Sequence, residues 1–169
     1  MEKDSGLIFS AGEIREKGGL TVSRKLDPGL FAGVLEAPAE VAKASADLVF
    51  SVGGGSILLD GAVRAALRLE CARCGVLFTA EFSETFDELY EDAVESIDVS
   101  GALAESVALM PPLKPLCAPA CKGLCAACGA DLNLKVCGCP AGHGEGFKEN
   151  GKENPFRALG EPVKKKRAK

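Results

Sequence analysis

The stretch that decides the fold runs from Ile57 to Cys74 and reads I-L-L-D-G-A-V-R-A-A-L-R-L-E-C-A-R-C. Up to Leu69, an apolar residue or a glycine stands at every second position, while the positions between them include Asp60 and Arg64. A period of two is typical of a β-strand with one buried face and one face in water. The stretch therefore predicts a long strand that ends in a C-x-x-C turn.

The flanking segments continue the same pattern. Alternation precedes the strand from Ala46 to Val52, a Gly53–Gly55 turn follows, and alternation resumes after the C-x-x-C turn from Val76 to Phe82. Leu7–Phe9 and Leu20–Leu26 are further strand candidates. We therefore expect an α+β, mainly β fold, built as an antiparallel meander or a partly open barrel. It carries a Cys-rich zinc-binding segment and a flexible basic C-terminal tail.

The charges of the chain are unevenly distributed. Residues 74–113 contain nine Asp or Glu and no Lys or Arg, whereas five of the last six residues are basic. We interpret the acids as a solvated face and Glu91–Ser100 as an acidic loop. Ser100 is a candidate cap for a short helix that ends at Pro111-Pro112. Its apolar face would consist of Leu103, Val107 and Met110.

Three parts follow from this pattern. Residues 1–98 are predicted to form an antiparallel β domain with a zinc knuckle at 71–74. Residues 99–140 hold the short helix and the Cys-rich segment. Residues 141–169 form a Gly-rich mobile linker, one helical turn at Asn154–Leu159 and the basic tail.

The chemistry of the chain lies in its eight cysteines. They form four pairs: Cys71 and Cys74, Cys117 and Cys121, Cys125 and Cys128, Cys137 and Cys139. The N-terminus lacks the apolar run of a signal peptide, and no segment is apolar enough to span a membrane. We therefore expect a cytoplasmic protein, in which paired thiols hold metal more often than they form disulfides.

Four pairs predict two tetrahedral Cys₄ sites, with two Zn²⁺ per chain. The preferred division places Cys125, Cys128, Cys137 and Cys139 in one site, and Cys71, Cys74, Cys117 and Cys121 in the other. An interleaved division remains open. Four sulfur ligands leave no open position for a substrate, so we expect structural metal, no catalytic residue and no enzymatic activity.

Two redox interpretations compete with structural zinc. The spacing Cys121-x₃-Cys125-x₂-Cys128 matches that of a radical-SAM iron–sulfur cluster, but the chain is too short for the accompanying barrel. A thioredoxin-like C-x-x-C would need a βαβ context, whereas Cys71 follows a predicted antiparallel strand. The single His143 lies in a Gly-rich stretch and is interpreted as a solvated loop residue. A thiol or metal redox enzyme is therefore the last alternative.

Four motifs together resemble the YceD family, whose members are linked to accumulation of 23S ribosomal RNA. They are L-E-C-A-R-C-G-x-x-F at Leu69–Phe78, L-C-A-P-A-C-K-G-L-C-A-A-C-G-A-D-L-N at Leu116–Asn133, C-G-C at Cys137–Cys139 and N-P-F-R-A-L at Asn154–Leu159. The resemblance covers the chain from about Leu59 onward. Gly75 departs from it, since many relatives carry Leu at that position. The resemblance implies a non-enzymatic ribosome biogenesis factor that supports accumulation or processing of 23S rRNA.

The resemblance also implies the partners. They are a large-subunit rRNA precursor or a ribosomal protein, with no membrane and no small-molecule substrate. The basic tail is then a candidate for RNA phosphate contact through Lys164, Lys165, Lys166, Arg167 and Lys169, and its alternative is a disordered end. The acidic body supports a second function, an adaptor that binds a basic ribosomal protein.

Overall fold

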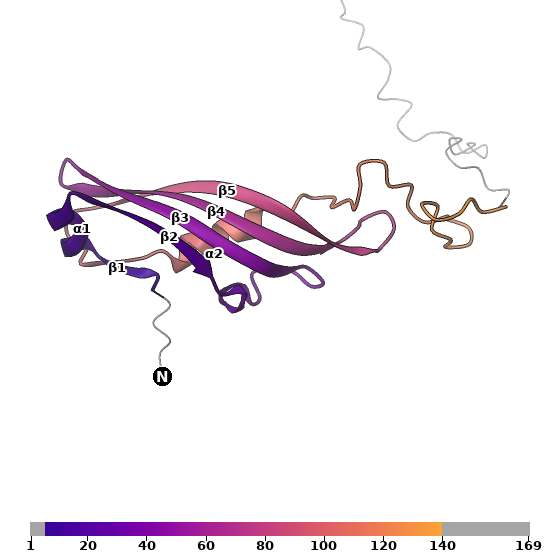
Figure 1. The fold of residues 1–169 in the computed structure, drawn as a ribbon, viewed down its shortest axis with the longest axis horizontal. Helices are drawn as coiled ribbons and strands as arrows, with labels where there is room; N and C mark the ends of the chain where they lie inside the picture. Colours follow the sequence, from indigo (N-terminus) through magenta and orange to yellow (C-terminus); the bar gives the residue numbers. More distant parts are fainter. Residues whose placement is uncertain (1–5, 140–169) are drawn as a thin grey trace, which may run out of the picture.

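The computed structural model describes residues 6–139 (Figure 1). The elements are β1 (Ile8–Ser10), α1 (Ala11–Lys17), β2 (Gly19–Leu26), the 3₁₀ helix η1 (Pro28–Phe31), β3 (Glu40–Gly53), β4 (Ser56–Glu70), β5 (Leu77–Tyr90), β6 (Ser96–Asp98) and α2 (Ser100–Leu109). A four-stranded antiparallel sheet has the order β2-β3-β4-β5, and β1 pairs with β6 in a second sheet. The mainly β, antiparallel prediction is confirmed. Within residues 6–139 the strands form a meander and do not close into a barrel, because β2 and β5 remain its edges.

The central strand β4 has the predicted period of two. Its residues alternate between buried and less buried along their whole length, and Ile57, Leu59, Val63 and Leu67 are fully buried. Gly61 lies on the same face, opposite Phe86 of β5. The Phe86 ring occupies the space that a Cβ at Gly61 would fill, so the missing side chain lets the ring pack over the strand.

One face of the four-stranded sheet carries the core. It is covered by α1, α2, η1 and the β1–β6 pair, and Phe9 of β1 packs against Phe50 of β3 with ring centroids 4.9 Å apart. The buried core consists of Leu7, Phe9, Ala11, Ile14, Leu26, Phe31, Ala44, Ala46, Leu48, Phe50, Ile57, Leu59, Val63, Ala65, Leu67, Leu69, Ile97, Val99, Leu103, Val107 and Met110. No cysteine belongs to this cluster, so the sheet and its cover are packed independently of the thiols.

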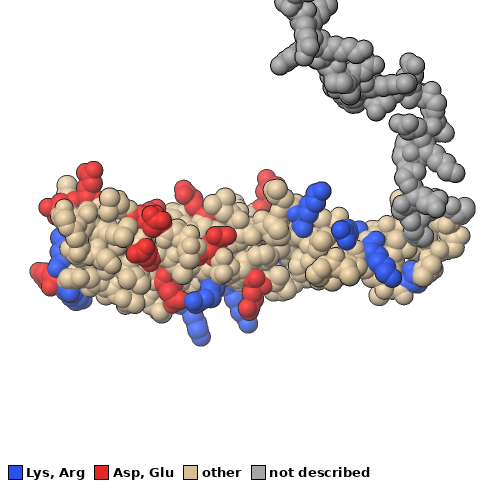
Figure 2. Space-filling view, turned by 90° about the horizontal axis from the view of Figure 1, so that it is seen from above, with Lys and Arg blue, Asp and Glu red and all other residues tan. Residues whose placement is uncertain are grey.

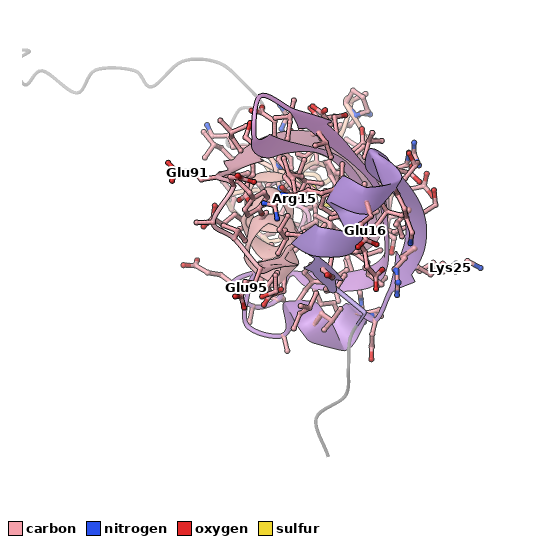
Figure 3. All side chains as sticks on the ribbon, turned by 90° about the vertical axis from the view of Figure 1, so that its left-hand side faces the viewer. Arg15, Glu16, Lys25, Glu91 and Glu95 are labelled. Atoms are coloured by element: carbon pink, nitrogen blue, oxygen red, sulfur yellow. The ribbon has the colours of Figure 1, made fainter. Side chains whose placement is uncertain are left out.

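The helix α1 is absent from the sequence-based expectations. Ser10 caps it by accepting a hydrogen bond from the Glu13 backbone N–H, and Gly18, at φ +69°, ends it in the left-handed conformation. Arg15 donates to the Asp92 carbonyl at 2.8 Å and fixes α1 to the acidic loop. Figure 3 shows Arg15 turned toward Glu91 and Glu95, with Lys25 on the opposite side of the molecule.

The expectation of an uninterrupted loop from Glu91 to Ser100 is wrong, since Ser96–Asp98 forms β6 opposite β1. Ser100 is also not the helix cap: Val99 occupies that position, and the Asp98 carboxylate accepts the Ser100 backbone N–H at 2.9 Å. The strand β6 and the shifted helix cap have one cause: Ile97 and Val99 are buried, and their burial holds the end of the loop against the core. The predicted apolar face of α2 is confirmed: Leu103, Val107 and Met110 are all buried.

The division into residues 1–98, 99–140 and 141–169 stays a prediction. Its last part, with the linker, the turn at Asn154–Leu159 and the basic tail, lies outside the described residues. Among residues 6–139, no helix has both the length and the apolar character needed to cross a membrane.

Candidate metal centres

The eight cysteines lie in two groups at the far end of the sheet. The first cluster consists of Cys71, Cys74, Cys117 and Cys121, and the second cluster consists of Cys125, Cys128, Cys137 and Cys139. This is the preferred division from the sequence, and the interleaved one does not occur. Figure 1 shows the Cys-rich segment, in orange, extending beyond the tip of the β4–β5 hairpin along the long axis of the sheet.

The sulfur geometry fits a metal ion better than a disulfide. Within each cluster the sulfur atoms all lie within 4.8 Å of one another, and none of the eight cysteines forms a disulfide. In the first cluster, Cys71 and Cys121 have their sulfurs 3.8 Å apart, and Cys74 and Cys117 have theirs 3.7 Å apart. Four sulfurs bound tetrahedrally to Zn²⁺ at about 2.3 Å are about 3.8 Å from each other. A disulfide would bring two of them to about 2.05 Å.

Two C-x-x-C-G turns have the same backbone geometry. In the first, the Gly75 N–H donates to the Cys71 carbonyl at 2.9 Å, and in the second the Gly129 N–H donates to the Cys125 carbonyl at 2.8 Å. Both glycines have φ of +71°, a conformation that other residues rarely adopt. The turn therefore favours Gly at both position 75 and position 129.

The first cluster joins the hairpin tip to the Cys-rich segment, and backbone hydrogen bonds reinforce the joint. The Ala72 N–H donates to the Pro115 carbonyl at 2.8 Å, and the Leu124 N–H donates to the Arg73 carbonyl at 3.1 Å. The Arg73 side chain donates to the Cys121 carbonyl at 2.7 Å. Arg73 therefore clamps the two halves of the site, a role that sequence reasoning missed.

Asn133 is the second residue that sequence reasoning missed. Its side-chain oxygen accepts the Lys122 backbone N–H at 2.7 Å, and its side-chain nitrogen lies 3.4 Å from the Cys121 sulfur. Asp131 in turn accepts from the Asn133 backbone N–H at 2.8 Å and from its side chain at 2.7 Å. This network orients the Cys121 sulfur, a candidate metal ligand, as outer-shell partners of metal ligands do. Its only sequence signal is the L-N that ends the Leu116–Asn133 motif.

The other two Cys pairs are held by irregular backbone. Cys117 and Cys121 are drawn together by a turn in which the Cys121 N–H donates to the Ala118 carbonyl at 3.0 Å, rather than by a helix. Cys137 and Cys139 flank Gly138 in a segment without regular structure. An extended strand would point these two side chains apart, so the irregular backbone lets both sulfurs reach Cys125 and Cys128.

The thiols within each cluster differ in acidity. The backbone N–H of Cys117 lowers the pKa of Cys71 to about 6, and the backbone N–H of Cys128 lowers the pKa of Cys125 to about 6. Burial raises the pKa of Cys117 to about 12, and the hydrogen bond with the Cys128 sulfur raises the pKa of Cys139 to about 12. Each cluster therefore has a thiol that ionises readily and one that keeps its proton unless a cation compensates the added charge.

Comparison with known proteins identifies a family over residues 59–161, which is more than half of the chain. The matching sequence model is described as "Large ribosomal RNA subunit accumulation protein YceD". The chain belongs to the YceD family. No curated protein and no solved structure matched the chain. The YceD match begins inside β4 and includes all eight cysteines, so β1, α1, β2 and β3 lie outside it.

Replacing Gly123 with alanine should loosen the first cluster. Gly123 has φ of +75°, and an added Cβ would lie 2.9 Å from the Arg73 carbonyl oxygen, which already accepts the Leu124 N–H. We expect backbone strain and the displaced carbonyl to cost about 1–3 kcal/mol, measured as metal release at a lower chelator concentration.

The matched control is Gly129→Ala. Gly129 has nearly the same φ, +71°, but no atom lies within 4 Å of an added Cβ. Gly129→Ala should therefore cost only the backbone strain of a positive φ, and any loss of metal should come from the second cluster, which contains Cys125 and Cys128. Equal metal retention in Gly123→Ala and the unmodified protein would contradict the clamping role of the Arg73 carbonyl.

Proposed function

We propose that this YceD-family chain is a non-enzymatic cytoplasmic factor that supports accumulation or processing of 23S rRNA, with its Cys-rich end held by two structural Zn²⁺. The family description supports the role in large-subunit rRNA. The two convergent Cys₄ groups support the metal, and thiolate sulfur is a donor that Zn²⁺ prefers. When bound, the metal supplies cross-linking between segments, while this chain's own hydrogen bonds orient the ligands.

The observation that carries the proposal is the overlap of the family match with the metal geometry. The match extends over most of the β4–β5 hairpin, α2 and both clusters, so the family match that supports the rRNA role also covers the thiols. In each cluster four sulfurs can fill a tetrahedral shell, which leaves no position for water or substrate. This arrangement favours action by contact over catalysis.

Deletion and complementation in the source cell test the function. Loss of the protein should lower mature 23S rRNA and large-subunit particles relative to small-subunit ones, as measured by RNA gels and sedimentation. The unmodified chain should restore both, and a variant with Cys125→Ser and Cys128→Ser should restore them poorly. Normal 23S levels and normal sedimentation in the deletion strain would refute the proposal.

An acidic groove favours the second candidate, an adaptor for a basic ribosomal protein. The groove lies between β5 and α2, has a volume of about 190 Å³ and is lined by Glu84, Asp87, Glu88 and Glu105 among others. If this function holds, a Glu84→Gln, Glu88→Gln variant should lose a basic ribosomal protein that the unmodified chain retains at physiological salt. Unchanged capture would exclude the groove as the docking site.

The redox alternative requires an accessible reactive thiol. Thiols committed to metal react slowly with alkylating agents, whereas a catalytic thiolate reacts fast. Mass spectrometry after brief iodoacetamide treatment of the zinc-loaded chain should therefore find all eight cysteines unmodified. Rapid modification of one of them would favour a thiol enzyme.

A further inference from the structure

The charge of the described chain is distributed unevenly along its long axis. Residues 6–70 and 77–110 contain seven basic and seventeen acidic residues, a formal net charge of −10. Residues 71–76 and 111–139, here called the Cys-rich end, contain four basic residues and one acidic residue. Figure 2 shows this end with Lys and Arg but no Asp or Glu on the visible face, whereas acids dominate the rest of that face.

The four cations of the Cys-rich end are available to a partner. They are Arg73, Lys114, Lys122 and Lys135, and all of them are exposed. Within residues 6–139 none of the four takes part in an ion pair. The single acid, Asp131, is engaged by the backbone and side chain of Asn133. On the sheet, by contrast, Arg64 is paired with Asp47 at 2.8 Å and Arg68 with Glu40 at 2.9 Å.

Metal loading does not remove this asymmetry. Four thiolates and one Zn²⁺ carry a formal charge of −2, so two loaded clusters would bring the Cys-rich end from +3 to −1, still far from −10. Backbone N–H groups at the sulfurs, such as that of Cys117 at Cys71, offset part of the thiolate charge. A polyanion therefore meets the least repulsion at this end, where four exposed cations lie without an ion pair among the described residues.

Three of the four cations also lie on backbone that hydrogen bonds hold in place. The Lys122 N–H is bound to the Asn133 side chain at 2.7 Å, and Arg73 is anchored to the Cys121 carbonyl at 2.7 Å while its other nitrogens stay free to donate. Lys135 follows a turn in which its own N–H donates to the Asp131 carbonyl at 3.1 Å. Fixed backbone lowers the conformational entropy that binding must remove.

We propose that the Cys-rich end is the surface with which the folded part of the chain contacts the phosphate backbone of large-subunit rRNA, through Arg73, Lys114, Lys122 and Lys135. This inference rests on the proposed rRNA function and places the contact on the folded chain, in addition to any contact from the basic tail. The acidic face over β5 and the β5–β6 loop then points away from the RNA. The four side chains would bind RNA phosphate groups, and this contact has no sequence specificity of its own.

A salt titration with two charge-matched variants tests the inference. The first variant carries Lys114→Gln, Lys122→Gln and Lys135→Gln, and leaves Arg73 in place because it clamps the first cluster. The control carries Lys17→Gln, Lys25→Gln and Lys43→Gln on α1, β2 and β3, where the side chains are also exposed and only Lys17 has an ion pair, with Glu13 at 3.6 Å. Each full-length, zinc-loaded protein is titrated into a large-subunit rRNA precursor fragment by fluorescence anisotropy between 50 and 200 mM salt.

Three lost phosphate contacts should make the slope of log affinity against log salt shallower by about 2 units, since each contact contributes roughly 0.7–0.9. At 50 mM salt the first variant should bind about tenfold or more weakly, while the control stays within about threefold of the unmodified chain. Metal content should equal two Zn²⁺ per chain in all three proteins.

Three outcomes would overturn the inference. Equal weakening in both variants would mean that only net charge matters. Unchanged binding in the first variant, with loss on removal of residues 164–169, would assign the contact to the tail alone. If the first variant lowered 23S accumulation in cells but bound the RNA fragment as tightly as the unmodified chain, the Cys-rich end would have a protein partner instead. Failure of the proposed function is a separate result, because it would appear as normal 23S levels in the deletion strain.

Discussion

Replacing Cys74 with serine should lower the bound metal from two ions per chain to one and release the Cys-rich segment from the hairpin tip. Cys74 lies 3.7 Å from Cys117 across the joint, so its loss removes a ligand that no other segment can supply. A structural Cys₄ site contributes folding free energy on the order of 10 kcal/mol. Elemental analysis should show the missing ion.

Hydrogen exchange should show where the structure opens. The Ala72 and Leu124 amides donate across the joint, to Pro115 and Arg73 respectively, and should exchange at the rate of an open segment in Cys74→Ser. The sheet amides should stay protected, because no thiol belongs to the hydrophobic core. Protected Ala72 and Leu124 amides together with two bound metals would show that Cys74 is not a ligand.

Cys128→Ser is the matched control for the second cluster. It should also lose one metal, but the amides of Ala72 and Leu124 should remain protected because the joint contains only the first cluster. If both variants opened the joint equally, the two clusters would have to be considered a single cooperative unit.

Replacing Phe50 with alanine should destabilise the sheet by about 3–5 kcal/mol, the range for a large aromatic removed from a packed core. Phe50 is 2% exposed, lies opposite Leu59 of β4 and packs against Phe9. The loss leaves a cavity where β1 covers the sheet. Chemical denaturation followed by circular dichroism measures the change as a lower midpoint with an unchanged slope.

Val49→Ala is the neighbouring control on the opposite face. Val49 is 39% exposed, so its truncation should change the free energy of unfolding by only about 0.5 kcal/mol. Metal content should remain at two ions in both variants, which separates sheet packing from the clusters. Similar losses for the two substitutions would contradict the period-two assignment of β3.

The features predicted correctly from the sequence are those with a local or strongly periodic cause. The long strand before Cys71 follows from thirteen alternating positions, Ile57 to Leu69, which no helix would bury on one side. The division of the thiols follows from a similar argument. Four of the cysteines lie within residues 125–139 and can converge without help from the rest of the chain.

The elements that were missed depend on contacts distant in sequence or on a short signal. β6 has only three residues and exists because it pairs with β1, which lies almost ninety residues earlier. The roles of Arg73 and Asn133 likewise require the hairpin tip and the Cys-rich segment to meet. The start of helix α1 did have a recognisable signal, because Ser10 and Glu13 are the serine and glutamate of a capping box. The helix was missed because the Gly18-Gly19 pair that ends it was interpreted only as a turn.

The separation of ligands along the chain sets the order in which the two clusters can form during folding. Cys74 and Cys117 are 43 residues apart, so the first cluster must close a long loop, whereas the second closes within fifteen residues. The long loop contains β5, β6 and α2, and its ends meet only when β5 has paired with β4 and α2 has docked. The second cluster could therefore bind the proposed zinc as soon as its segment leaves the ribosome. With the zinc binding proposed above, a loaded first cluster would report that the sheet is complete. An unmodified chain with metal in the second cluster alone would be one that has not finished folding.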